Sequence, residues 1–452
     1  MKRRTRMIAA VLVAAALSLT ACTGGEQGPT SSALFDPDAP TIQYGLLADK
    51  PYDGENISFL ICCPQAGQFV KWGESIAEFT ELTGITVNFT NDPLDGLREK
   101  IITQSVAAPG LWDVTMFFDT WLPELTGFLE PLENVMPVNL EDYPPILADL
   151  TQRDGVVYGI PARSHVMFLE YRTDVFEQLG LEVPKTYEEL LQTAQTISES
   201  DLGIAGFTMN WAKQPSMSPM PWINFVQASG GSIFDENGMP TFTSPEAIAA
   251  TEVYRDLAKY APVGAIGYNE GDSRTAFAQG KAAMTLGWSW YHEIYTGPTA
   301  AEEVRNNVGY SAYTPSAKGP GSSIAMTWPL GISSTSRHKG AAAEWVKWVT
   351  NPDLDLSIIV DKSNPKTSTV IANRIPSLRS PAANAPDANN GYSDAMADAF
   401  ERATHQPIYL GFSSVTETIE VALSDIMSGA DIESTLKTAN AQATEILKKI
   451  NK

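Results

Sequence analysis

The feature that most constrains the fold is a regular alternation of strand and helix patterns early in the chain. Asn56–Ile61 is a short β-rich run, and Phe69–Leu82 carries apolar residues at helical spacing. The strand pattern Ile85–Phe89, the helix pattern Leu97–Val106 and the strand pattern Trp112–Phe118 follow. Strands that alternate with helices predict an α/β protein built on an open sheet.

Ligands of open α/β sheets bind beyond the carboxyl ends of the strands. Two adjacent cysteines, Cys62 and Cys63, follow the first strand pattern there. One or both of them pack as small hydrophobes, or they form a vicinal disulfide, or they are reactive or bridge two molecules. A vicinal disulfide is strained, because adjacent Cα atoms lie only about 3.8 Å apart. The sequence leaves these three interpretations open.

The N-terminal segment has the pattern of a secretory signal. Basic residues precede the apolar run Met7–Leu19, which is shorter than the ~20 residues that cross a bilayer. The small residues before Cys22 resemble a bacterial lipobox, although an ordinary signal peptide that contains a cysteine would look similar. We expect a signal peptide at residues 1–21, lipidation of Cys22, and a flexible tether at residues 22–40.

Composition excludes several classes of function. The net charge of −22 disfavours polyanionic partners such as nucleic acid. The four histidines are far apart in sequence, and no zinc-binding, phosphate-loop or G-x-S-x-G pattern occurs. We therefore expect no metal, no cofactor and no enzymatic activity, although a pair of carboxylates for glycoside hydrolysis is not excluded by sequence.

Tryptophan is the positive signal. Trp72, Trp345 and Trp348 occupy helical positions and are expected in the core. Other tryptophans stand beside predicted loops, where an indole face suits the C–H face of a sugar. The tryptophans of this second group are Trp121, Trp211, Trp222, Trp288, Trp290 and Trp328.

Eight segments together resemble the extracellular solute-binding proteins of ABC importers, the family that includes the maltose-binding protein. Each segment is weak alone, but their order behind a lipobox is specific. They are Trp72–Val87, Leu111–Val114, Gly155–Pro161, Phe168–Asp174, Pro184–Leu190, Ala228–Gly231, Phe277–Met284 and Ser428–Glu433.

The resemblance implies two α/β lobes of the periplasmic-binding-protein type, joined by a hinge and closing on a ligand in the interlobe cleft. Lobe one would comprise residues 41–162 plus 326–365, and lobe two residues 163–325 plus 366–452. The chain would cross between the lobes near Ile160–Ser164, Pro320–Thr327 and Pro365–Ile371. The protein would be a monomer, anchored to the outer face of the bacterial cell membrane, that delivers its ligand to permease subunits.

The resemblance also assigns ligand contacts residue by residue. The loop after the first strand, the loop after the third, the first crossover and two stacking aromatics match positions that bind ligand in the family. Together with the tryptophans above, the predicted site comprises Cys62, Cys63, Gln65, Gln68, Phe118, Asp119, Trp121, Arg163, His165, Trp211, Trp222, Trp288, Trp290, Trp328, Arg374 and Phe412.

Two departures weaken parts of this assignment. The family often has Tyr-Asn-Lys where this chain has Tyr171-Arg172-Thr173, and its first loop usually carries polar or acidic residues instead of a cysteine pair. A mono- or oligosaccharide is the expected ligand. A polyol, glycerophospho-compound, amino acid or peptide is the alternative, and a phosphorylated ligand would use Arg163 and Arg374.

Overall fold

The computed structural model describes residues 35–62, 67–94, 96–214, 217–361, 372–385, 391–405, 409 and 411–450. Residues from Ala33 onward form one compact unit. Within the described ranges, no helix combines the length and the apolar character that a bilayer crossing requires.

The predicted alternation of strands and helices is confirmed in the first part of this unit. The elements are β1 (Asn56–Ile61), α1 (Gly67–Thr83), β2 (Thr86–Asn91), α2 (Leu97–Ala107) and β3 (Val114–Met116). Both β2 and β3 run parallel to β1, as crossover helices require. Strand β3 is shorter than predicted, because the chain turns into a short 3-10 helix at Asp119.

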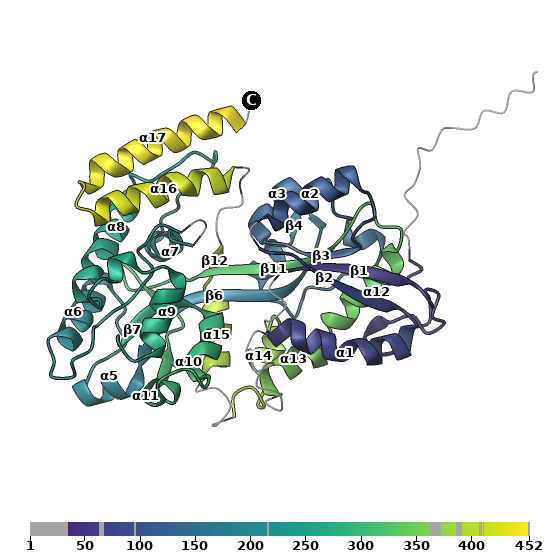
Figure 1. Ribbon diagram of the computed structural model, residues 1–452, viewed down its shortest axis with the longest axis horizontal. Coiled ribbons are helices and arrows are strands. Elements are labelled where there is room, and N and C mark those ends of the chain that lie inside the picture. Colours follow the sequence, from purple (N-terminus) through teal and green to yellow (C-terminus); the bar gives the residue numbers. More distant parts are fainter. Residues whose placement is uncertain are drawn as a thin grey trace, which may run out of the picture. The chain divides into compact units, whose positions relative to one another are not determined.

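The main sheet is mixed, with strand order β2-β1-β3-β11-β6-β7. Strand β11 (Ile324–Ile332) runs antiparallel to both β3 and β6 (Ile160–Arg172), and β6 is antiparallel to β7 (Met284–Trp288). Short strands β8 (Val308–Tyr310) and β12 (Thr404–His405) pair with β6 and β11. Figure 1 shows β6 and β11 side by side along their length.

Two small hairpins lie outside the main sheet. Strand β4 (Gln152–Arg153) pairs with β5 (Val156–Val157), and β9 (Thr314–Pro315) pairs with β10 (Pro320–Gly321). The remaining helices of four residues or more, taken from the described ranges, are α3 (Leu122–Leu125), α4 (Pro145–Asp149), α5 (Thr173–Leu179), α6 (Tyr187–Ser198), α7 (Met220–Ala228), α8 (Pro245–Leu257), α9 (Glu270–Ala278), α10 (His292–Thr296), α11 (Glu302–Arg305), α12 (Lys339–Val349), α13 (Pro352–Val360), α14 (Ile375–Leu378), α15 (Tyr392–Glu401), α16 (Phe412–Met427) and α17 (Ile432–Ile450).

Helix starts follow local sequence chemistry. The Thr186 side chain accepts a hydrogen bond from the Glu189 N–H, and the Glu189 carboxylate accepts one from the Thr186 N–H. Helix α6 therefore begins with a capping box. The Ser244 hydroxyl accepts from the Ala247 N–H, with Pro245 in the first turn of α8. The local sequence therefore accounts for the start of both helices.

The buried apolar side chains form separate clusters that the two long strands connect. One cluster includes Trp72 and Trp345 with the β1–β3 region, and a second includes Trp222 with α6–α8. Strand β6 contributes Ile160 to the first cluster and Leu169 to the second. Strand β11 likewise contributes to both. The predicted crossover Ile160–Ser164 lies on β6, and the end of the predicted crossover Pro320–Thr327 lies on β11.

The third predicted crossover, at residues 365–371, lies outside the described residues. The lobe boundaries stay a prediction for that reason. A third cluster also complicates them, because Leu147 and Leu150 pack with Tyr392 and Phe400, which the prediction assigned to the other lobe.

Candidate functional site

Three aromatic side chains meet where β3 ends beside β11. Phe118 lies with its ring centroid 4.0 Å from that of Trp328 and 5.0 Å from that of Trp121. Trp328 is nearly buried, whereas Phe118 and Trp121 are partly exposed. We call these three residues the aromatic wall. The sequence predicted all three as ligand contacts, and the structure brings them together.

Local sequence explains how the wall forms. After β3 the chain forms the 3-10 helix Asp119–Trp121, and this turn brings the rings of Phe118 and Trp121 into contact. On β11, the register shifts between Trp328 and Pro329. Proline lacks the N–H that a regular ladder uses, so a bulge at this point is expected.

Asp119 lies within the wall and is itself buried. Its carboxylate accepts the backbone N–H of Thr120 at 2.6 Å and that of Thr327, the residue before Trp328, at 2.8 Å. Burial raises the pKa of Asp119 to about 7, while the bonds from Thr327 and Thr120 oppose that shift. The carboxylate therefore ties the loop after β3 to β11.

The end of β7 carries the second group of predicted residues. Trp288 is only 3% exposed, so its indole face is covered in this structure, whereas Trp290 is partly exposed. The Arg274 guanidinium lies 4.8 Å from the centre of the Trp290 ring. A cation above an indole is stabilising, and it restricts one face of that ring.

Ser289, between these tryptophans, fixes the loop to its neighbours. Its carbonyl accepts the Tyr392 hydroxyl at 2.7 Å, and its own hydroxyl accepts the Val166 N–H at 3.3 Å. The same hydroxyl lies 3.4 Å from His165 Nδ1. The position of the loop therefore depends on β6 and α15, which sequence reasoning did not foresee.

Charged groups on β6 and α10 complete this region. Arg163 pairs in register with Trp328 of the wall. Burial raises the pKa of Glu293 to about 7, and the charge of Arg163 opposes the shift. Burial, with a further effect from Arg163, lowers the pKa of His165 well below its ordinary value, so its imidazole is neutral at pH 7. The sequence analysis did not predict Glu293 as a site residue. The only sign of it in the sequence is its position one helical turn after Trp290.

The first predicted loop is described only at its ends. Cys62 is fully buried after β1 and packs in the core of the β1–β3 region. Gln68 is buried in α1, and its side-chain amide donates to the carbonyl of Ala162 on β6. Cys63 and Gln65 lie outside the described residues, so the three interpretations of the cysteine pair stay open.

Four of the predicted residues make contacts within the scaffold, and their part in ligand binding stays a prediction. The Trp211 and Trp222 side chains lie in the core, and their indole N–H groups donate to the Tyr254 carbonyl and the Thr251 hydroxyl. Phe412 is also a core residue, at the start of α16.

The fourth of these residues is Arg374. Its guanidinium donates to the Thr350 carbonyl and to the carboxylate of Asp142, and it stacks on Tyr143 with its central carbon 4.3 Å from the ring centre. These contacts join parts of the scaffold. Arg374 is therefore already engaged by scaffold groups.

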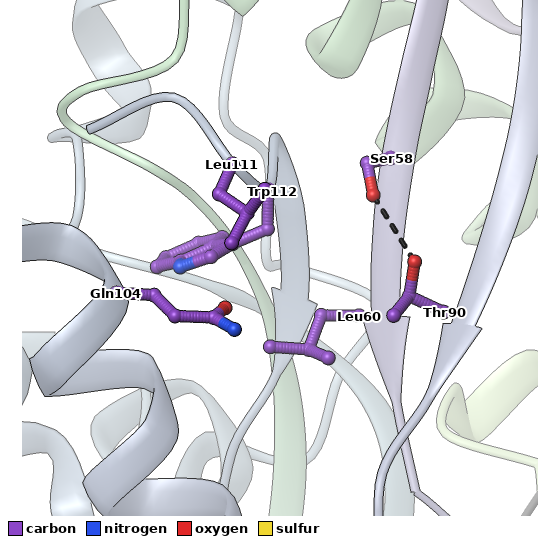
Figure 2. Close-up of a pocket in the computed structure, with 6 residues that line it drawn as sticks. All are labelled: Ser58, Leu60, Thr90, Gln104, Leu111 and Trp112. Atoms are coloured by element: carbon purple, nitrogen blue, oxygen red, sulfur yellow. Dashed lines mark hydrogen bonds between the residues drawn. The ribbon is translucent and has the colours of Figure 1, made fainter. Parts of the chain in front are cut away.

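A cavity of about 210 Å³ lies elsewhere, between α2 and the β1–β2 part of the sheet (Figure 2). The Ser58 and Thr90 hydroxyl oxygens in its lining are 3.3 Å apart. None of the predicted site residues lines this cavity, whose lining comprises Ser58, Leu60, Thr90, Gln104, Leu111 and Trp112. Within the described ranges, no group of three His, Cys, Asp or Glu residues is arranged to hold a metal ion.

Comparison with known proteins establishes the class. A family model described as "Bacterial extracellular solute-binding protein" matches residues 66–354. The match spans more than half of the chain, so this protein belongs to that family. Its fold is the two-lobe α/β fold of periplasmic binding proteins.

Individual relatives are distant. A probable amino-acid ABC transporter periplasmic-binding protein of Sinorhizobium fredii is 24% identical over 317 residues, which are 68% of this chain and 71% of that protein. A mannitol-binding protein of Pseudomonas aeruginosa is 26% identical over 266 residues, 56% of this chain and 60% of the relative.

Solved structures show the same fold. A solute-binding protein of Agrobacterium radiobacter K84 in complex with ribitol has a TM-score of 0.73 and 23% identity, over 88% of this chain and all of the other. Maltose-bound T. maritima MalE3 has a TM-score of 0.74 and 22% identity, over 86% and 99% of the two chains.

Proposed function

We propose that this protein is the substrate-binding component of an ABC importer for a neutral polyhydroxylated solute, a sugar or a polyol. The aromatic wall is the observation that carries the proposal. Its partly exposed rings, Phe118 and Trp121, offer apolar faces, and its third ring, Trp328, is the register partner of the charged Arg163 on β6. Apolar faces beside hydrogen-bonding groups suit the C–H and O–H groups of such a ligand.

The charges favour a neutral ligand over an anionic one. Arg163 acts electrostatically on Glu293, so the positive charge in this region is accompanied by a carboxylate. Arg374 is engaged by Thr350 and Asp142 and does not add a second cation. The nearby carboxylate would repel a phosphate group. An uncharged diol can instead accept a hydrogen bond from the arginine and donate one to the carboxylate.

Relatives support this choice of ligand. The mannitol-binding protein of Pseudomonas aeruginosa and the ribitol and maltose complexes all concern neutral polyhydroxylated molecules. The relative from Sinorhizobium fredii carries an amino-acid transporter description instead, so an amino acid is the second candidate.

The proposal includes membrane attachment and delivery. Lipidation at Cys22 and a tether through residue 40 would hold the binding unit at the outer face of the membrane, where closure on a ligand presents it to the permease subunits. Lipid attachment predicts that the protein with Cys22→Ala is released from membranes into the soluble fraction. Retention of that variant on the membrane would contradict it.

A thermal-shift screen tests the ligand class. Ligands that bind the native state raise the unfolding temperature in proportion to the logarithm of their excess over Kd. We expect shifts with maltose, mannitol, ribitol or related compounds, and none with glycerol 3-phosphate. A shift only with amino acids would favour the second candidate, and conversion of a sugar to product would overturn both.

A further inference from the structure

We propose that Asp119 is a positioning residue, which holds the two arms of the aromatic wall together and thereby sets ligand affinity. The first arm is the segment Phe118–Trp121, after β3, and the second is Trp328 on β11. This inference rests on the proposed function, because the wall is the ligand surface proposed above.

The contacts of Asp119 connect the two arms directly. One carboxylate oxygen accepts the Thr120 N–H, within the first arm, and the other accepts the Thr327 N–H, immediately before Trp328. The side chain belongs to a residue that is 2% exposed, so water does not offer alternative donors of the same quality. Loss of the second bond would leave the Thr327 N–H unsatisfied in the interior.

The connection continues to the second long strand. The Thr327 hydroxyl lies 2.9 Å from that of Ser164, its register partner on β6, and both residues are fully buried. Asp119 therefore positions the wall relative to β6, where Arg163 lies one residue away from Ser164. A shift of the first arm would change the distance between the aromatic faces and the charged groups together.

Asp113 offers a matched comparison at the other end of β3. It is also buried, and its carboxylate accepts the Ser58 N–H at 2.8 Å and the Ser336 hydroxyl at 2.6 Å. Its contacts lie outside the wall. Replacement of Asp113 should therefore affect stability without a specific effect on ligand binding.

The charge state of Asp119 gives a readout that a merely structural role would not produce. Protonation converts one accepting oxygen into a donor that faces an N–H group, which weakens the connection. Because burial raises the pKa of Asp119 to about 7, affinity should fall as the pH is lowered through that value. The surrounding charged and titratable groups are Arg163 and His165 on β6 and Glu124 on α3. The Glu124 carboxylate forms an ion pair with the Arg98 guanidinium, and β11 carries no charged or titratable residue.

Glu293 also has a pKa raised to about 7, so its variant must be measured in parallel. The experiment compares the wild type, Asp119→Asn, Asp113→Asn and Glu293→Gln by calorimetry between pH 5.5 and 8.5. The titrant is a sugar or polyol that stabilises the wild type. We expect Asp119→Asn to lose about tenfold or more in affinity at pH 8.5 and to show a flatter pH profile. Asp113→Asn should change affinity by less than about twofold. Glu293→Gln should retain the part of the pH dependence of affinity that is due to Asp119.

Equal losses in Asp119→Asn and Asp113→Asn, or an unchanged profile in Asp119→Asn, would overturn the assignment. A second measurement needs neither a variant nor a ligand. The amide NMR signals of Thr120 and Thr327 in the wild type should titrate together near pH 7. Their insensitivity to pH would overturn the role of Asp119, whereas failure of all sugars and polyols to bind, with intact titration, would overturn only the proposed function.

Discussion

Glu170 is the residue whose environment departs most from what its charge would prefer. It lies on β6 with no exposed surface, and burial raises its pKa well above the ordinary value. Burial therefore favours the neutral acid over the carboxylate in the folded protein. Sequence alone gives no sign of this, because Phe168–Asp174 looks like a strand that ends in ordinary charged residues.

Replacement of Glu170 by glutamine should stabilise the protein above the pKa of an unfolded glutamate. Below that pKa, both states of the wild type bind the proton, so Glu170 has no effect on the pH dependence. Above it, the unfolded state releases the proton and the folded state does not, so wild-type stability falls as pH rises. The gap in unfolding temperature between Glu170→Gln and wild type should widen from pH 5 to pH 8. A constant gap, or equal behaviour of the exposed control Glu188→Gln, would contradict this.

At the residue level, sequence can predict which side chains share a location where adjacent positions in the chain are also adjacent in space. Phe118, Asp119 and Trp121 form one turn, so their shared location follows from the strand that precedes them. Sequence could not predict that Trp211 and Trp222 pack in the core, because a tryptophan beside glycine, proline or asparagine looks the same in sequence whether it packs inward or outward. Burial of an indole N–H requires a distant partner, here Tyr254 or Thr251, that sequence does not reveal.

At the scale of elements, periodicity located the helices predicted at Phe69–Leu82 and Leu97–Val106 to within a few residues, as α1 and α2 show. Strand order could not be predicted in the same way. The antiparallel insertion of β11 between β3 and β6 depends on pairing across more than 150 residues, as in the register of Ser164 with Thr327.

Strand β7 supplies a test at this scale. A Cβ atom placed on Gly287 would lie 2.2 Å from a carboxyl oxygen of Glu170 and 2.7 Å from the Tyr291 ring. Gly287→Ala should therefore destabilise the protein by about 1–3 kcal/mol, as overpacking does. The control Gly127→Ala meets no atom within 4 Å of its new Cβ and should be close to neutral. Chemical denaturation of both variants measures the difference, and equal stabilities would contradict the packing around Gly287.

At the scale of the whole molecule, the two long strands decide how the site is built. Strands β6 and β11 each contribute to separate hydrophobic clusters and carry Arg163 and Trp328 as register partners between them. The sequence predicted these two crossovers from a family resemblance, whereas periodicity alone would have given two unrelated strands. The lobe boundaries remain a prediction, because residues 365–371 are not described.

The central claim is that the aromatic wall binds a sugar or polyol. Isothermal calorimetry with a ligand from the thermal-shift screen tests it most directly, on the wild type, Trp121→Ala and the core control Trp222→Phe. The usual energy of an aromatic contact predicts that Trp121→Ala loses roughly tenfold or more in affinity, which corresponds to about 1.4 kcal/mol. Trp222→Phe should bind as the wild type does, because Trp222 is buried away from the wall. Unchanged affinity in Trp121→Ala would contradict the claim.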